Sequence, residues 1–174
     1  MAANIGGKIK KLKLKHLEIE RKYLINQKLW DRAEKPEPRF LTQGYLCSDD
    51  KKVIRIRIVQ TNAGRRGYLT LKGRMQNLGR PEYEYEVPAE EASDLLALIQ
   101  SRPVEKIRYK YPHKGKIWDV DIFLGENKGL FLAEIELDDP DEVIDFPEWV
   151  GDEVSHDPRY YNAYLALHPF NTWK

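Results

Sequence analysis

The chain has 174 residues, with 29 Lys and Arg against 28 Asp and Glu and a net charge of +1. This length predicts one domain with a sizeable core, and the small net charge argues against nucleic-acid or membrane partners recruited by an overall field. Cys47 is the single cysteine, so no internal disulfide can form, and no apolar run is long enough to span a bilayer. The sequence therefore predicts a cytoplasmic protein.

Residues 1–16 form a basic stretch with five lysines, two glycines and little to pack. Such a composition predicts a flexible tail, with a basic arm for an acidic partner as the alternative. We expect the folded domain to comprise 17–174.

After the tail, most of the sequence alternates apolar and charged residues with period two, which is typical of strands with one buried face. Many short strands with few helices favour an antiparallel barrel, because closing the sheet removes exposed edges. The predicted class is all-β dominated (α+β), an eight-stranded antiparallel barrel with covering helices. The eight strands are expected at 17–25, 39–47, 53–60, 66–72, 82–87, 104–112, 116–123 and 130–137.

Two amphipathic helices are expected to cover the barrel. The first follows Pro88 and is about three turns long. The second begins with Asp157 as its N-cap and ends near His168, before Pro169. The segment 26–38 predicts a loop with a turn of helix. The first helix is predicted from apolar residues spaced i, i+3, i+4 and i+7: Ala92, Leu95, Leu96 and Ile99.

The first strand places Glu18, Glu20 and Lys22 on one face, because successive side chains of a strand point to opposite sides. Carboxylate oxygens are the ligands that Mg²⁺ or Mn²⁺ prefers, and a lysine is a point charge for a phosphoryl oxygen. The pattern alone is also that of an ordinary solvated strand.

The same arrangement returns in most other strands. Their shared charged faces carry Arg55, Arg57, Lys72, Glu82, Glu84, Glu86, Lys106, Arg108, Lys110, Asp119, Asp121, Glu134 and Glu136.

Two placements of these faces are possible. With the charges in water, the chain would be a barrel that carries a hydrophobic ligand. Each strand, however, carries a block of mostly one sign, and like charges two residues apart gain nothing from each other. The two helices would also have nothing to cover if the apolar faces pointed inward. We therefore predict a tunnel with charges of both signs, which suits a polyanion and its divalent cations.

These motifs resemble the CYTH, or triphosphate tunnel metalloenzyme, family over 17–168. The resemblance rests on HLEIERKYLI, QGYL, the two arginines of RIR, LTLKG, RPEYEYEVP, EKIRYKY, WDVDIF and AEIEL, and on the closing run FPEWVGDEVSHDPRYYNAYLA. It implies an eight-stranded antiparallel barrel whose charged interior binds a triphosphate and a divalent metal.

The resemblance also implies roles for particular residues. Glu82 and Glu84 match the family pattern, but their role, on metal or in orienting basic side chains, stays open. The implied metal is Mg²⁺ or Mn²⁺, with Glu18, Glu20, Lys22 and Glu136 as catalytic residues. The implied metal ligands are Glu18, Glu20, Asp121, Glu134 and Glu136. The implied phosphate contacts are Lys22, Arg55, Arg57, Lys72, Arg80, Lys106 and Arg108.

We expect metal-dependent hydrolysis of a linear triphosphate, with inorganic tripolyphosphate as the favoured substrate. Thiamine triphosphatase, ATPase and adenylyl cyclase activities on the same site are alternatives, as is a non-catalytic polyphosphate-binding module. A homodimer is possible if Trp149 and Trp173 are exposed, although both could be core residues.

Overall fold

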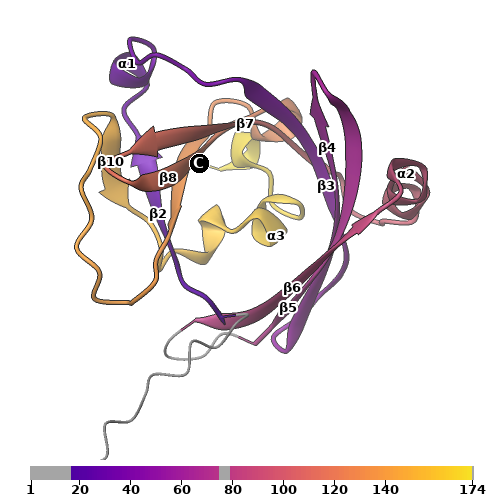
Figure 1. The fold of residues 1–174 in the computed structure, drawn as a ribbon. Helices are drawn as coiled ribbons and strands as arrows, with labels where there is room; N and C mark the ends of the chain where they lie inside the picture. The colour runs from indigo at the N-terminus through magenta and orange to yellow at the C-terminus, as the bar shows by residue number, and fades with distance from the viewer. Residues whose placement is uncertain (1–16, 75–78, 174) are drawn as a thin grey trace, which may run out of the picture.

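The computed structural model describes residues 17–74 and 79–173. Their strands form one antiparallel sheet in the order β1-β6-β5-β4-β3-β7-β8-β9-β2-β10, curled into a barrel (Figure 1). The bounds are β1 Leu17–Glu18, β2 Glu20–Ile25, β3 Pro38–Ser48, β4 Lys52–Thr61, β5 Gly64–Gly73, β6 Arg80–Val87, β7 Val104–His113, β8 Lys116–Phe123, β9 Phe131–Glu136 and β10 Val150–Glu153.

The first strand segment joins the two ends of the sheet. β1 and β2 are consecutive in the chain and are interrupted only at Ile19. β1 pairs with β6 at two positions, and β2 pairs with β9 from Glu20 opposite Glu136 to Leu24 opposite Leu132. Among the described residues the ring is completed over those two β1–β6 positions only, so the barrel is not closed along its length.

The sheet has ten strands rather than the predicted eight. One additional strand arises because the expected strand 17–25 divides at Ile19 into β1 and β2. The other is β10, which pairs irregularly with β2. Its sequence, VGDE, is too short and polar to show an alternating pattern. The antiparallel barrel architecture itself is confirmed.

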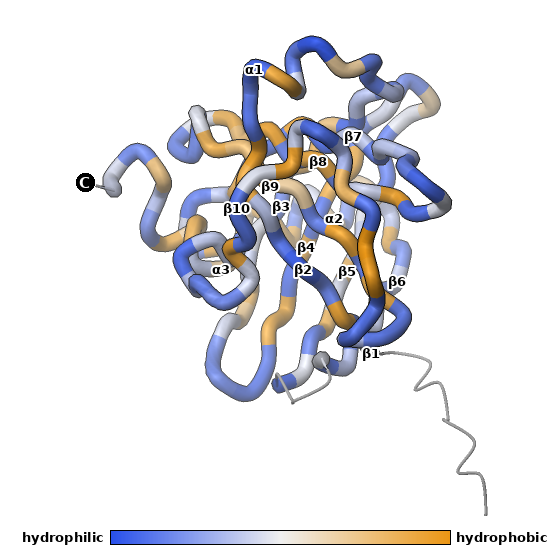
Figure 2. The backbone as a smooth tube through the Cα atoms, turned by 90° about the vertical axis from the view of Figure 1, so that its left-hand side faces the viewer, coloured by the Kyte–Doolittle hydropathy of each residue, from blue (hydrophilic) through white to orange (hydrophobic). Residues whose placement is uncertain are grey.

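The charged faces of the strands point into the barrel and the apolar faces point outward, as predicted. Figure 2 shows hydrophilic and hydrophobic residues alternating along the strands. One outward cluster surrounds Trp30, Trp118 and Trp149 and is covered by α1, Gln27–Trp30, which is the turn of helix expected in 26–38. Trp149 is buried in this cluster, so it offers no surface to a second copy. A homodimer stays a prediction.

The first covering helix is confirmed as α2, Ala89–Ala97. It lies outside the barrel against β4 and β5 (Figure 1), where Ala92 packs with Ile56 and Ile58. Gly67 of β5 allows this close approach, because a Cβ atom there would lie 2.6 Å from the Cβ of Ala92. None of the helices in the described ranges is long and apolar enough to cross a membrane.

The prediction of one long second helix was wrong. Asp157 does cap a turn, since its side chain accepts a hydrogen bond from the Arg159 amide, but the 3₁₀ turn η2, Pro158–Tyr160, ends at an extended Tyr161. A new short helix, α3, then spans Asn162–Leu165. The remaining 3₁₀ turns are η1, Gly125–Asn127, and η3, Phe170–Thr172.

This C-terminal segment does not cover the outside of the barrel. Seen along the barrel axis, α3 lies within the ring of strands (Figure 1). Leu165 packs there with Val104, Phe123 and Leu132, which are apolar residues near the ends of the strands. The apolar side of α3 is therefore buried against the barrel wall, which leaves its polar side toward the interior.

Replacement of Gly67 by Ala should lower the free energy of unfolding by about 1–3 kcal/mol, because α2 must shift to make room for the added methyl group. Chemical denaturation measures this loss. In the double variant Gly67→Ala, Ala92→Gly the closest contact is relieved and the one with the Val87 carbonyl oxygen, at 2.9 Å, remains, so the two losses should be less than additive. Strict additivity would contradict the proposed contact.

Candidate active site

The interior of the barrel is a charged cavity of about 890 Å³. Among the described residues, ten basic and nine acidic side chains line it, so their charges sum to only +1. The basic residues are Lys22, Arg39, Lys52, Arg55, Arg57, Lys72, Arg74, Arg80, Arg108 and Lys110. The acidic residues are Glu18, Glu20, Asp49, Asp50, Glu82, Glu84, Asp119, Glu134 and Glu136.

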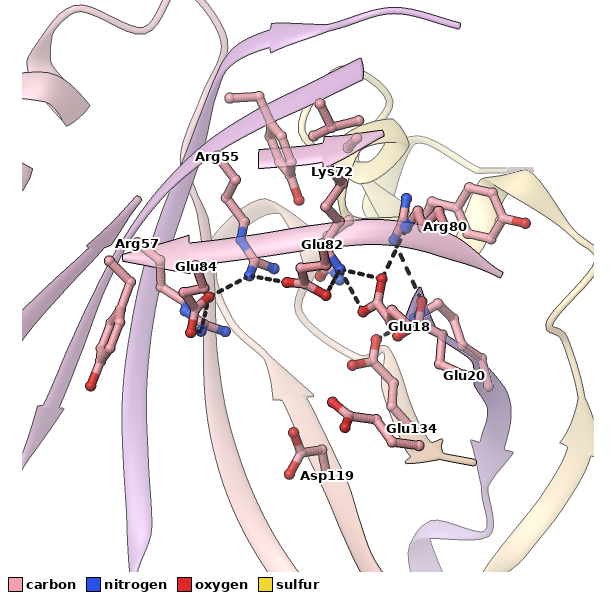
Figure 3. A pocket seen from close by; sticks show the side chains of 18 of the residues that line it. Glu18, Glu20, Arg55, Arg57, Lys72, Arg80, Glu82, Glu84, Asp119 and Glu134 are labelled. Carbon is pink, nitrogen blue, oxygen red and sulfur yellow. Dashed lines mark hydrogen bonds and ion pairs between the residues drawn. The ribbon is translucent and has the colours of Figure 1, made fainter. Parts of the chain in front are cut away.

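One wall, from β4 to β6, holds the paired arginines. Glu84 lies between them (Figure 3), accepting hydrogen bonds from Arg57 at 2.8 Å and Arg55 at 3.2 Å. The hydroxyl of Thr70 donates to the same carboxylate at 2.7 Å. Burial raises the pKa of Glu84, but these partners outweigh it and lower the pKa below its ordinary value. Glu84 therefore fixes the position of both guanidinium groups.

Arg57 sits in an environment that favours an added anion. Burial and the neighbouring cations Arg55 and Arg108 lower its pKa to about 10, despite the pairing with Glu84. Its guanidinium also lies 5.5 Å from the ring centre of Tyr68. A phosphate oxygen bound here would relieve the repulsion between the cations.

The acidic pair of the first strand bonds mainly to cations. Glu18 accepts from Lys72 at 2.6 Å and from Arg80 at 2.9 Å (Figure 3). Glu20 lies 2.9 Å from Lys22. The short β1–β6 pairing brings these groups together, because it places Glu18 directly opposite Arg80.

Lys22 is held between carboxylates of two strands, with its Nζ 2.6 Å from Glu134 and 2.9 Å from Glu20. Burial alone would lower the pKa of Lys22, but the two carboxylates outweigh it and raise the pKa far above its ordinary value. In the same way burial would raise the pKa of Glu134, yet Lys22 and Arg108 hold it well below the usual range. Lys22 is thus a permanent cation.

Two of the predicted site residues do not line the cavity. Lys106 and Asp121 are fully buried behind it, with their Nζ and Oδ2 atoms 2.5 Å apart. Asp121 also receives two hydrogen bonds from Arg108, at 2.6 Å each. Their position indicates support for Arg108, which does line the cavity and which also contacts Glu134 at 2.8 Å.

Glu136 differs from the other predicted carboxylates of the cavity, because within the described chain it makes no ion pair. Burial, followed by the negative charges of Glu18 and Asp119, raises its pKa above the ordinary value. It stands directly opposite Glu20 in the β2–β9 pairing. This is where the cavity would accept a cation.

Within the described ranges, no three Asp, Glu, His or Cys side chains converge closely enough to make a complete metal site. A divalent metal held here would therefore need ligands besides these carboxylates, such as water or substrate phosphates.

Several lining residues were not predicted as site residues. Arg39 shares the inward face with Gln43 and Tyr45, so strand parity could have indicated it. The hydroxyl of Tyr45 accepts a hydrogen bond from Gln43 at 2.8 Å, and burial raises its pKa to about 12. No sequence signal indicated Asn162, because its segment was expected outside the barrel.

Comparisons with known proteins give a consistent result. The CYTH domain model matches residues 16–161. The chain is 42% identical over 158 residues to an inorganic triphosphatase of Acetivibrio thermocellus, covering 90% of this chain and 97% of that protein. It is 35% identical to an inorganic triphosphatase of Nitrosomonas europaea, covering 86% and 97%. The crystal structure of the inorganic triphosphatase NE1496 superposes with a TM-score of 0.59 at 32% identity, covering 86% of this chain and 94% of that one.

An antiparallel barrel with a charged interior, matched by this family model over most of its length, defines the class of protein. The chain belongs to the CYTH domain family.

Glu136→Gln should raise the midpoint of thermal unfolding at neutral pH in the presence of a chelator. The folded-state pKa of Glu136 is raised. Ionisation of Glu136 therefore costs stability above that pKa, and the cost disappears as the pH falls below the ordinary pKa of Glu. The gain should be small because the side chain is partly solvated, and it should fade toward acid pH.

Glu86→Gln is the matched control, since Glu86 is an exposed residue of β6 paired with Arg66 at 3.6 Å. It should change the midpoint little. A Glu136→Gln variant less stable than the native protein at neutral pH without metal would show that Glu136 has a cationic partner.

Asp121→Asn should be far more damaging than any change at Glu136. The substitution leaves Lys106 and part of Arg108 buried without their carboxylate, which typically costs about 3–5 kcal/mol. Urea denaturation measures the loss. A loss below about 1 kcal/mol would indicate that water reaches the pair.

Proposed function

We propose that the protein hydrolyses a linear triphosphate, inorganic tripolyphosphate, inside the barrel. The observation that carries the proposal is the division of the cavity. Cations of β4 to β7 that are held by carboxylates face a carboxylate cluster in which Glu136 makes no ion pair with any residue that the structure describes. Both curated relatives described above are inorganic triphosphatases, which supports the same substrate.

The charge balance of the cavity supports a role for a divalent metal. Its walls carry a net charge of +1, whereas a triphosphate brings several negative charges. Glu136 and Glu20, adjacent on paired strands, have the hard oxygen donors that Mg²⁺ or Mn²⁺ prefers. When bound there, the metal would neutralise phosphoryl oxygens and lower the pKa of a water molecule.

The protein itself would supply position and charge, which is most of what phosphoryl transfer requires. Arg55, Arg57 and Arg108 would bind phosphate oxygens, and Glu84 and Asp121 would hold these guanidinium groups in place. Glu82 would have the same role as Glu84, because its carboxylate pairs with the ammonium group of Lys72 at 3.1 Å and so holds that cation in place. These ion pairs support a role for Glu82 and Glu84 in orienting cations rather than in binding metal.

Lys22 is assigned to charge stabilisation rather than to proton abstraction. A general base must lose its own proton near the working pH, and the raised pKa of Lys22 prevents this. The lysine would instead contact a phosphate oxygen between Glu20 and Glu134.

The decisive experiment is phosphate release from tripolyphosphate, ATP and thiamine triphosphate, each with Mg²⁺, Mn²⁺ or a chelator. We expect release from tripolyphosphate with metal and little from the organic triphosphates. Release from none of them would overturn the enzymatic function, and preference for an organic triphosphate would overturn the substrate.

Separate roles for the two walls predict different kinetic effects. Arg57→Ala should mainly raise KM for the triphosphate, by about 10-fold or more, because a charge-assisted hydrogen bond is lost. Glu136→Gln should mainly lower kcat and shift the metal requirement to higher concentration. Arg66→Ala, an exposed arginine of β5, serves as the control. Equal small effects from Arg57→Ala and Glu136→Gln would contradict the assignment.

A further inference from the structure

The C-terminal segment is fixed to the barrel wall at two lysines. The amide of Val154 donates to the carbonyl of Lys22 at 2.8 Å, and the amide of Lys22 donates to the hydroxyl of Ser155 at 2.9 Å. Further along, the Nζ of Lys106 donates to the Oδ1 of Asn162 at 3.2 Å. The segment between these points crosses the interior of the barrel (Figure 1) and supplies lining residues to the cavity.

The bond from Lys106 determines which way the side-chain amide of Asn162 points. An ammonium group can only donate, so the atom that faces Lys106 must be the carbonyl oxygen Oδ1 and not Nδ2. Asn162 itself lines the cavity. Its Nδ2 group therefore retains both N–H donors, and no acceptor among the described residues takes either of them.

An amide donor in this place is suited to a phosphate oxygen. In the described chain, eight of the ten basic residues that line the cavity are already bonded to carboxylates, as Lys22 is to Glu134 and Arg108 is to Asp121. The Nδ2 group of Asn162 carries no such partner and no charge, so its use costs no ion pair. Asn162 is half-buried and lines the cavity, so water can occupy its free N–H groups until a phosphate oxygen replaces that water.

We propose that Asn162 is a substrate-binding residue, whose Nδ2 group donates a hydrogen bond to a phosphate oxygen of the bound triphosphate. Lys106 then acts as a positioning residue, because it holds Oδ1 and so directs Nδ2 into the cavity. The C-terminal segment contributes directly to binding and is not only a packing element. This proposal rests on the proposed function of the cavity.

Two substitutions separate hydrogen-bond donation by Asn162 from its attachment to Lys106. Asn162→Ala removes both. Asn162→Asp keeps an acceptor for Lys106, which preserves the attachment, but it removes the donor and places a negative charge beside the phosphate. A purely structural residue should therefore tolerate Asp better than Ala, whereas a substrate-binding residue should tolerate Asp worse.

The test is titration calorimetry of tripolyphosphate with the full chain in a chelator, together with KM and kcat for tripolyphosphate with Mg²⁺. Asn162→Ala should weaken binding and raise KM by about 10-fold, the loss expected for one hydrogen bond to a charged group. Asn162→Asp should weaken binding further. Unfolding midpoints without ligand confirm that each variant is folded, and the ion pair to Lys106 favours folding of the Asp variant.

Asn171→Ala is the matched control, because Asn171 belongs to the same C-terminal segment but bonds to the exposed Glu126 at 3.0 Å. It should bind as the native chain does. Binding by Asn162→Asp equal to or tighter than the native chain, Asn162→Ala within twofold of it, or an equal loss in Asn171→Ala would each overturn the proposal. Failure of the native chain itself to bind or cleave tripolyphosphate would instead refute the proposed function.

Discussion

Charge pairing inside the barrel is the constraint on which the rest of this structure depends. Ionised side chains lose their hydration when a sheet curls around them, and they are tolerated only when opposite charges and hydrogen bonds replace the water. Each wall meets this requirement with its own ion pairs. The carboxylate of Glu84 pairs with two arginines. Glu18 pairs with Lys72 and Arg80, and Glu134 pairs with Lys22. Glu136 makes no ion pair among the described residues, so its carboxylate is available to a bound cation.

The pairing also explains why the apolar faces of the strands need external cover. With charges inside, the hydrophobic side of the sheet faces outward, and it would be exposed without added layers. α2 covers the β4–β5 region, and α1 with the segment before β10 encloses the tryptophan cluster. This inverts the arrangement of a barrel that carries a hydrophobic ligand.

A balanced cavity has a functional consequence. A site lined only by cations would bind phosphate chains tightly. Repulsion between those cations would, however, oppose folding, and products would be released slowly. The carboxylates reduce the net charge to +1 and hold the cations in fixed positions, so a bound metal would add to the affinity for an anion. The hypothesis that metal and triphosphate bind together follows from this balance.

Strand parity by itself determined much of this protein: which side chains share a face, the antiparallel barrel, and most of the charged residues that line the cavity. These features depend on spacings of two residues along one strand, which a sequence displays directly. Only the tertiary structure decided which side chains lie one layer behind the wall, because Lys106 and Arg108 have the same parity and differ in what packs over them. The tertiary structure also decided that the C-terminal segment runs inside the barrel, and with it the position of Asn162. A short helix with one apolar side has the same sequence pattern whether it packs on the inner or on the outer wall of the barrel.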